Sequence, residues 1–176
     1  LLRPLIEITT TLDPRLEIAY RYGAVFLCEP PPSGAGRPDE GIEVLEEGAR
    51  YVPGSWRLRQ NLGFFRFLYQ GDARGAAAEL EEAAALPGAA FWLRTLAADL
   101  LAKGGDLEAS RQMWQQMYDQ AEEGILRIHA ELQLAILDSR AAAERLTALV
   151  AEVERGQGRR PEKLEELRRL GVWPGP

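Results

Sequence analysis

The two residue types that most often carry enzyme chemistry, histidine and cysteine, each occur once in this chain of 176 residues, as His129 and Cys28. His129 stands at helical spacing from Ile125 and Leu132, which is typical of a histidine at the edge of an apolar core. No nucleophile-elbow motif accompanies it, so a Ser–His–Asp triad is not expected. A single cysteine excludes an internal disulfide and a cysteine-cluster metal site. We expect Cys28 to be a small buried residue near a helix end.

Acidic residues occur in adjacent pairs that fall on predicted polar helix faces. There we expect solvated carboxylates rather than the dyad of a hydrolase. The pairs are Glu46–Glu47, Glu81–Glu82 and Glu122–Glu123. The segment GAGRPDEG at 34–41 contains glycines but lacks the lysine and the preceding strand of a phosphate-binding loop. No metal-ligand spacing is present, so we predict no catalytic residue, no cofactor and no metal site, and a protein that is not an enzyme.

The net charge and the hydropathy of the sequence limit the classes of partner that the protein is expected to bind. The formal net charge of −6 argues against a binder of nucleic-acid backbones, which would need a basic face. No apolar run reaches the roughly 18 residues of a membrane helix. The sequence begins at Leu1 without an initiator methionine, so membrane contact is expected only through an anchor upstream of Leu1.

The elements that position these residues repeat at a spacing of 34 residues. Pro53–Gly54 recurs as Pro87–Gly88, Gly71–Asp72 recurs as Gly105–Asp106, and Leu80 is matched by Trp114. By the same spacing Leu62 corresponds to Leu96, and Gly63 corresponds to Ala97 or Ala98. Glycine and proline mark turns, so paired helices separated by turns are predicted between Trp56 and Tyr118. A period of 34 with helix–turn–helix content is typical of tetratricopeptide repeats.

An earlier copy of the repeat is predicted if an insertion is allowed. Gly23 then corresponds to Gly63 at an offset of 40, and the excess residues lie at 29–37, where Pro30, Pro31 and Pro32 cannot continue a helix. This insertion is either a tolerated loop or a proline-rich contact element for a partner.

The segments NLGFFRFLYQGDARGAAAELEEAAALPG and LAADLLAKGGDLEASRQMWQQMYDQ resemble tetratricopeptide repeat (TPR) proteins. Small residues typical of the family occur at Gly63, Ala76, Ala83 and Ala109 or Ser110, large ones at Leu80 and Trp114, and closing prolines at Pro53 and Pro87. Two further segments, ITTTLDPRLEIAYRYGAVFL and GSWRLRQNLGFFRFLYQGD, resemble a bacterial subgroup whose members often carry an N-terminal membrane anchor.

The resemblance implies a concave groove lined by the first helix of each hairpin, with a protein or peptide partner held there. Arginine, amide and aromatic side chains at groove positions can hold a peptide backbone or a carboxylate. The predicted groove residues are Tyr20, Arg21, Arg57, Gln60, Asn61, Phe64, Arg94 and Thr95, flanked by Glu17 and Phe91. Arg57 and Asn61 loosely match the carboxylate clamp of the family, whose lysines are absent. The apolar run Phe64–Tyr69 is predicted to be mostly core.

Both ends carry helical patterns of their own. Residues 1–12 are predicted to be a helix, followed by a second that Asp13 caps and Pro14 opens. Residues 121–155 predict a helical segment that either caps the last hairpin or forms a coiled-coil seam with a partner, with a break near Asp138–Arg140. The tail predicts a loop and a short helix over 161–170, and Trp173 is a candidate anchor.

We therefore predict an all-α, TPR-like α-solenoid of about three hairpins with a capping helix and a short tail helix. The predicted domains are 1–120 for the hairpins, 121–155 for the capping segment and 156–176 for the tail. The predicted function is a non-catalytic protein–protein interaction scaffold. The alternative is a structural or accessory subunit of an envelope complex or filament that uses its ends for self-association. The compartment stays open: the cell envelope if an anchor or leader precedes Leu1, and the cytoplasm otherwise.

Overall fold

The computed structural model describes residues 2–173 and divides the chain into two compact units, Leu1–Trp114 and Gln115–Pro176. Helices account for 74% of the described residues and no strand occurs among them, so the predicted all-α class is confirmed. The first unit holds α1 (Leu2–Leu12), α2 (Glu17–Cys28), α3 (Pro38–Tyr51), α4 (Trp56–Phe65) with the π-helical turn η1 (Arg66–Gln70), α5 (Ala73–Ala84) and α6 (Leu93–Lys103). Helix α7 (Leu107–Gln120) spans the boundary, and α8 (Ile125–Gln157) and α9 (Leu164–Arg169) belong to the second unit.

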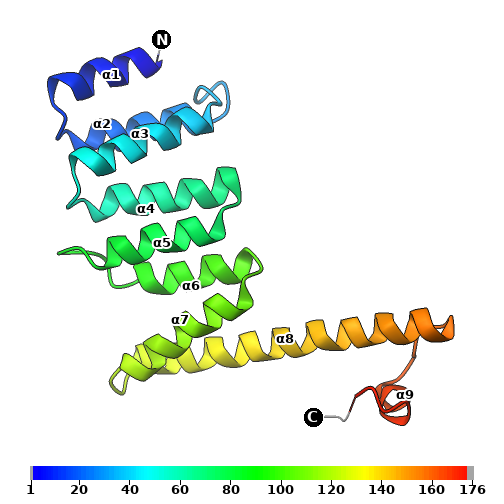
Figure 1. The fold of residues 1–176 in the computed structure, drawn as a ribbon. Coiled ribbons are helices and arrows are strands. Elements are labelled where there is room, and N and C mark those ends of the chain that lie inside the picture. Colours follow the sequence, from blue (N-terminus) through cyan, green and yellow to red (C-terminus); the bar gives the residue numbers. More distant parts are fainter. Residues whose placement is uncertain (1, 174–176) are drawn as a thin grey trace. The chain divides into compact units, whose positions relative to one another are not determined.

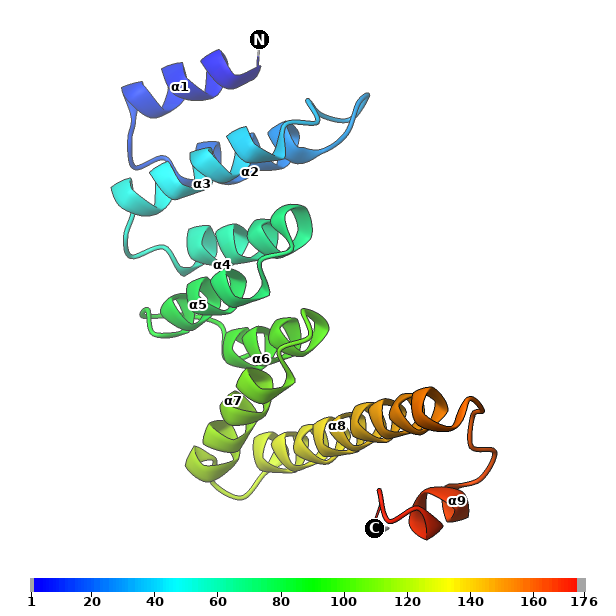
Figure 2. The same cartoon turned by 45° about the vertical axis from the view of Figure 1, so that its right-hand side comes forward.

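Helices α1 to α6 pack in chain order, each against the next (Figure 1). A view turned by 45° shows the same succession (Figure 2). One core cluster joins α1 to α4, with Tyr20, Leu27, Leu45 and Leu58 fully buried. Because each helix buries apolar residues on the sides that face its neighbours, the remaining side stays open to solvent.

The repeated Gly–Asp pairs form similar turns before α5 and α7. Gly71 and Gly105 adopt left-handed backbone conformations, with φ of 67° and 87°, which glycine tolerates best. The Asp72 carboxylate then accepts a hydrogen bond from the Gly75 N–H at 2.8 Å. Asp106 accepts from the Ala109 N–H at 3.2 Å. Each aspartate thus satisfies an unpaired N–H at a helix start, which explains why the pair recurs.

The start of α2 differs from the prediction. Asp13 does not cap a helix beginning at Pro14, because its carboxylate accepts a hydrogen bond from the Arg15 N–H at 2.9 Å. The Leu16 N–H donates to the Asp13 carbonyl at 3.1 Å, and the helix begins only at Glu17. This local turn satisfies the aspartate within the loop and delays the helix by three residues.

Residues 29–37, the predicted insertion, form the loop between α2 and α3. It folds back on the end of α2, since the Ala35 N–H donates to the Phe26 carbonyl and the Arg37 N–H donates to the Leu27 carbonyl, at 2.8 and 2.7 Å. Cys28 is the last residue of α2 and is buried, as expected.

Gly23 is not the counterpart of Gly63. A Cβ at Gly63 would lie 2.8 Å from the Ala76 carbonyl of α5, so Gly63 allows α4 and α5 to approach closely. A Cβ at Gly23 would instead lie 2.8 Å from Ile6 of α1. In α2 it is Ala24 that lies close to the next helix, since its carbonyl lies 3.0 Å from where a Cβ of Gly41 on α3 would be.

The spacing between α4 and α6 contains two compensating shifts. The buried residues Leu58, Leu62 and Gly63 match Leu93, Ala97 and Ala98, which are all fully buried and lie 35 residues on. Ala97 therefore replaces the half-buried Leu96 as the counterpart of Leu62, and Ala98 as that of Gly63. The offset returns to 34 at the following glycines because α4 ends in a π-helical turn, which holds one extra residue.

The π-helical turn also determines how far the apolar run that begins at Phe64 is buried. None of its residues within η1 is buried, and Leu68 and Tyr69 are 58% and 40% exposed. The prediction that this run is mostly core is wrong. A wider turn rotates successive side chains differently from an α-helix, so no single side collects them. Phe65 and Tyr69 still meet edge to face, with ring centroids 5.6 Å apart.

In the second unit α8 is one helix of 33 residues, so the predicted break near Asp138–Arg140 is wrong. Those polar residues are exposed and leave the helix uninterrupted. Val153 near its end and Leu167 of α9 are both buried, and α9 packs on α8. Within residues 2–173 no helix combines the length and apolar character required to cross a bilayer.

Candidate functional site

The predicted groove residues of α4 lie along one side of that helix. They stand opposite the buried Leu58 and Leu62 and are half-buried or exposed. These residues are Arg57, Gln60, Asn61 and Phe64. Spacings of three, one and three residues align side chains on one helix face. We call this side of α4, with the equivalent sides of α2 and α6, the open face.

Arg57 is held at the start of the open face. Its guanidinium lies 4.3 Å from the centre of the Trp56 ring, a distance at which cation and π system attract. The Ser55 hydroxyl accepts a hydrogen bond from the Leu58 N–H at 3.2 Å and fixes the first turn of α4 beneath it. Arg57 is exposed, so its forked N–H donors remain available to a carboxylate.

Tyr20 does not belong to the open face. The side chain is fully buried, and its hydroxyl donates a hydrogen bond to the Pro14 carbonyl at 3.1 Å. Burial, and then the nearby Glu47 carboxylate, raise the pKa of Tyr20. The exposed residues on α2 are Ile18, Tyr22 and Phe26, at 56%, 55% and 49%, which the sequence reasoning missed. Their spacing of four residues is the signal that could have identified them.

Arg21 lies beside Tyr22 on α2 and is half-buried. Its guanidinium pairs with Glu17, the flanking residue of the predicted groove, at 3.3 Å. The Nε–H of Arg21 is buried without a hydrogen-bond partner. A buried donor without an acceptor is unfavourable, so this N–H lowers the stability of the fold rather than offering a contact to a ligand.

On α6 the two predicted residues separate. The Thr95 hydroxyl donates to the Trp92 carbonyl at 2.8 Å and lies on the open face. Arg94 is displaced by about 100° around the helix, toward the buried Ala98 and Leu101. Its counterpart on α4 is Arg59, which is not on the open face either. Phe91 is 94% exposed in the turn before α6.

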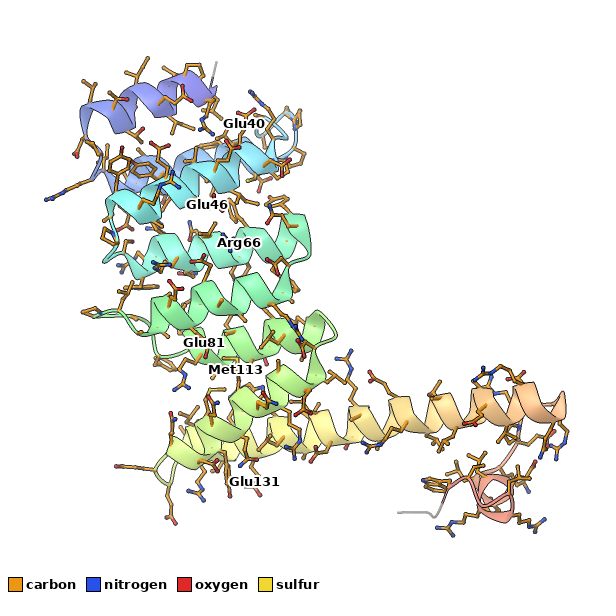
Figure 3. All side chains as sticks on the ribbon, in the orientation of Figure 1. Glu40, Glu46, Arg66, Glu81, Met113 and Glu131 are labelled. Atoms are coloured by element: carbon orange, nitrogen blue, oxygen red, sulfur yellow. The ribbon has the colours of Figure 1, made fainter. Side chains whose placement is uncertain are left out.

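A second polar cluster, missed by the sequence reasoning, lies where α3, α4, η1 and α5 meet. Arg59 pairs with Glu79 at 3.0 Å and also with Glu82. Arg66 pairs with Glu46 at 3.0 Å and with Glu79 at 3.4 Å. Figure 3 shows Glu46 and Arg66 on neighbouring segments. These five residues form the Arg–Glu cluster.

The Arg–Glu cluster borders a hollow of about 410 Å³ that Arg50 and Leu62 also line. The Glu79 side chain is only 13% exposed and binds both arginines, so each of these charges already has a partner inside the protein. Such a network stabilises the contact between neighbouring helices rather than presenting a free charge to a ligand.

Cys28 and His129, the residue types that most often carry enzyme chemistry, lie on α2 and α8. The pKa of Cys28 is raised to about 11 by burial, and next by the carboxylates of Glu29 and Asp39. His129 has its Nε2 atom 3.3 Å from the Gln133 side-chain nitrogen. Among residues 2–173 no group of three or more His, Cys, Asp or Glu side chains gathers as a metal site would require. Comparisons with protein-family models, curated proteins and solved structures find no match to this chain.

A hollow of about 450 Å³ lies along the two Gly–Asp turns. Both of its carboxylates are engaged, since Asp72 and Asp106 cap helices and Asp106 also pairs with Arg74 at 2.5 Å. The hydrogen bond from Arg74, and then that from the Ala109 N–H, lower the pKa of Asp106. These carboxylates therefore serve the turns that connect α4 with α5 and α6 with α7.

Proposed function

We propose that the chain is a TPR-type helical repeat protein whose hairpins are α2 with α3, α4 with α5, and α6 with α7. The support comes from three features that recur together: Gly–Asp turns within hairpins, Pro–Gly turns between them, and small residues at close helix contacts. Ser110 fits the pattern better than Ala109, because it is fully buried and follows Ala76 by 34 residues. A period of this length is the signature of the family.

We further propose that it acts without catalysis, as a scaffold that binds an extended segment of another protein on the open face. The observation that carries this proposal is that α2 and α4 leave the same side uncovered, and that this side combines charged, amide and apolar side chains. Arg57 offers paired donors for a carboxylate, and Asn61 offers an amide that matches a peptide bond. Ile18 and Tyr22 provide apolar contact beside them.

Selection of peptides on the immobilised protein from a random library tests this function. We expect enriched peptides with acidic and apolar residues, which bind the wild-type chain in solution. Asn61→Ala and Tyr22→Ala should each weaken that binding about tenfold or more, in the range of residues that matter in an interface. Both positions are half-buried or exposed, so the helix content measured by circular dichroism should not change.

The matched control is Glu81→Ala on α5, at the exposed position labelled in Figure 3 and away from the open face. It should leave peptide affinity unchanged. If no peptide is enriched, or if the open-face variants bind as tightly as Glu81→Ala, the open face is not the binding surface.

A further inference from the structure

Helix α1 carries two apolar sides, and only one of them is covered. Ile6 is buried against Gly23 of α2. Leu5, Ile8 and Leu12 point elsewhere and are 61%, 58% and 82% exposed. Their spacings of three and four residues place them on one side of the helix. We call these three residues the α1 stripe.

The same spacing is found on α3, where it is covered. Leu45 and Gly48 of α3 and Val52, the residue directly after this helix, follow one another by three and four residues, and Leu45 is fully buried. Helix α2 packs on this side, since a Cβ at Gly48 would lie 2.7 Å from the Tyr20 ring. The α1 stripe therefore has the pattern of a second helix whose first helix is not packed on it.

Helix α8 has an uncovered stripe of its own. Ile125, Ile128, Leu132 and Ile136 are 88%, 67%, 56% and 49% exposed and follow one another at helical spacing. We call them the α8 stripe. Packing by α9 buries the far end of α8 at Val153 and does not reach these residues. An apolar stripe of this length on one helix marks an interaction surface.

The α8 stripe has the register of a first helix. Ile128 and Leu132 follow Arg94 and Ala98 of α6 by 34 residues. The counterparts of Arg94 and Ala98 on α4 are Arg59 and Gly63, and both face the second helix of their hairpin. Arg59 pairs with Glu79 of α5 at 3.0 Å, and the Cβ position of Gly63 lies 2.8 Å from the Ala76 carbonyl.

We propose that the α8 stripe of one copy packs on the α1 stripe of a second copy, which completes a helical hairpin between the two chains. One chain thus presents both halves of such a contact: a second-helix stripe at α1 and a first-helix stripe at α8. Because the two stripes differ, the contact is head to tail, and each copy keeps one free stripe for the next. Association then proceeds beyond the dimer unless a ring closes. The inference uses the proposed repeat register but not the peptide-binding role of the open face.

Sedimentation velocity of the full chain from about 10 µM to about 1 mM, a range that covers weak protein contacts, tests the proposal. The mean mass should rise with concentration above that of the 19.6 kDa monomer and past the dimer. Leu5→Asp and Leu132→Asp each place a charge in one stripe and should weaken association by at least about 30-fold, the loss typical of a central interface residue. Both side chains are more than half exposed, so circular dichroism should report an unchanged fold.

A mixture of the two variants is the decisive experiment. The Leu5→Asp chain keeps an intact α8 stripe and the Leu132→Asp chain keeps an intact α1 stripe, so an equimolar mixture should form a heterodimer that grows no further. Leu68→Asp, a control at another exposed apolar position, should associate as the wild type does.

Several results would overturn the proposal. A wild-type chain that stays monomeric at the highest concentration shows that the stripes do not meet. Continued association of Leu132→Asp indicates α1 pairing with α1, and continued association of Leu5→Asp indicates α8 pairing with α8. A mixture without heterodimer excludes the head-to-tail contact. Leu5→Asp should still bind the selected peptides with wild-type affinity. Measuring that affinity distinguishes a failure of the self-association proposal from a failure of the proposed peptide binding on the open face.

Discussion

Replacement of Gly41 by alanine probes how closely α2 and α3 approach one another. The new Cβ would lie 2.3 Å from the Cys28 Sγ and 3.0 Å from the Ala24 carbonyl oxygen. Non-bonded heavy atoms are comfortable at about 3.5–4.0 Å. The helices must therefore separate by roughly 1 Å at this point, or the Cys28 side chain must move within a full core.

The expected loss follows from two opposing effects. Alanine stabilises a helix interior by about 0.5–1 kcal/mol relative to glycine. Overpacking of a filled core costs about 1–3 kcal/mol, and a contact this short to a buried neighbour belongs at the upper end. Gly41→Ala should thus lower the free energy of unfolding by about 2 kcal/mol. Removal of the sulfur with Cys28→Ala should reduce that loss by about 1 kcal/mol, because only the contact with Ala24 then remains.

Denaturant unfolding followed by tryptophan fluorescence measures the effect on the first unit, which contains Trp56, Trp92 and Trp114. Gly156→Ala is the control, since a Cβ there meets nothing within 4 Å and the residue lies in the last turn of α8. It should leave the first unit unchanged. If Gly41→Ala is as stable as the wild type, or if its effect simply adds to that of Cys28→Ala, the two helices do not touch as described.

Two further results are expected. Deletion of Leu68 removes the extra residue of η1, so an ordinary α-helical end should form and the free energy of unfolding of the first unit should stay within about 1 kcal/mol of the wild-type value. Deletion of Ala78 in α5, as a control, rotates the following core residues by about 100° and should unfold the first unit. The Cys28 thiol, with a pKa near 11, should react with iodoacetamide at pH 8 about 100-fold more slowly than the thiol of the unfolded chain, because thiolate is the reacting form. The unfolded chain loses this proton from about pH 9, so the free energy of unfolding should fall between pH 9 and 11, by at most about 3 kcal/mol. Cys28→Ala should remove this part of the dependence and leave the part that Tyr20, whose pKa is also raised, contributes from about pH 10.

Features of the fold that depend on local signals could be predicted from the sequence. The Gly–Asp pairs at 71–72 and 105–106 form a turn and cap the following helix without help from distant residues, and the prolines at 30–32 prevent the preceding helix from continuing. Asp13 shows the limit of such signals. An aspartate before a proline can cap a helix or close a turn within the loop, and the choice depends on where the following helix packs.

The alignment of one helix with another was harder to predict, because it depends on contacts between helices that sequence spacing does not reveal. The offset of 34 is correct at both turns, yet α4 and α6 align at 35 between them. Nothing in the composition of residues 66–70 indicates a π-helical turn. The same uncertainty affected the candidate site. The sequence indicated Tyr20, whereas Tyr22 is the exposed residue, and it indicated both Arg94 and Thr95, of which only Thr95 lies on the open face. A shift of one residue along a helix turns a side chain by about 100°, so a small error in register changes the side on which it lies.

The positions of the arginines explain why residue type alone could not identify a binding surface. Helix α4 has one side against α3, one against α5, and one left for solvent. Arg59 lies on a covered side, where Glu79 binds it at 3.0 Å and its charge holds α4 to α5. Arg57, two residues earlier, lies on the uncovered side and contacts only the Trp56 ring among the interactions described. Because packing fixes the first two sides, the third is where side chains are free to suit a partner, and Arg57 with Asn61 is therefore where a loss of binding without a loss of stability should be sought.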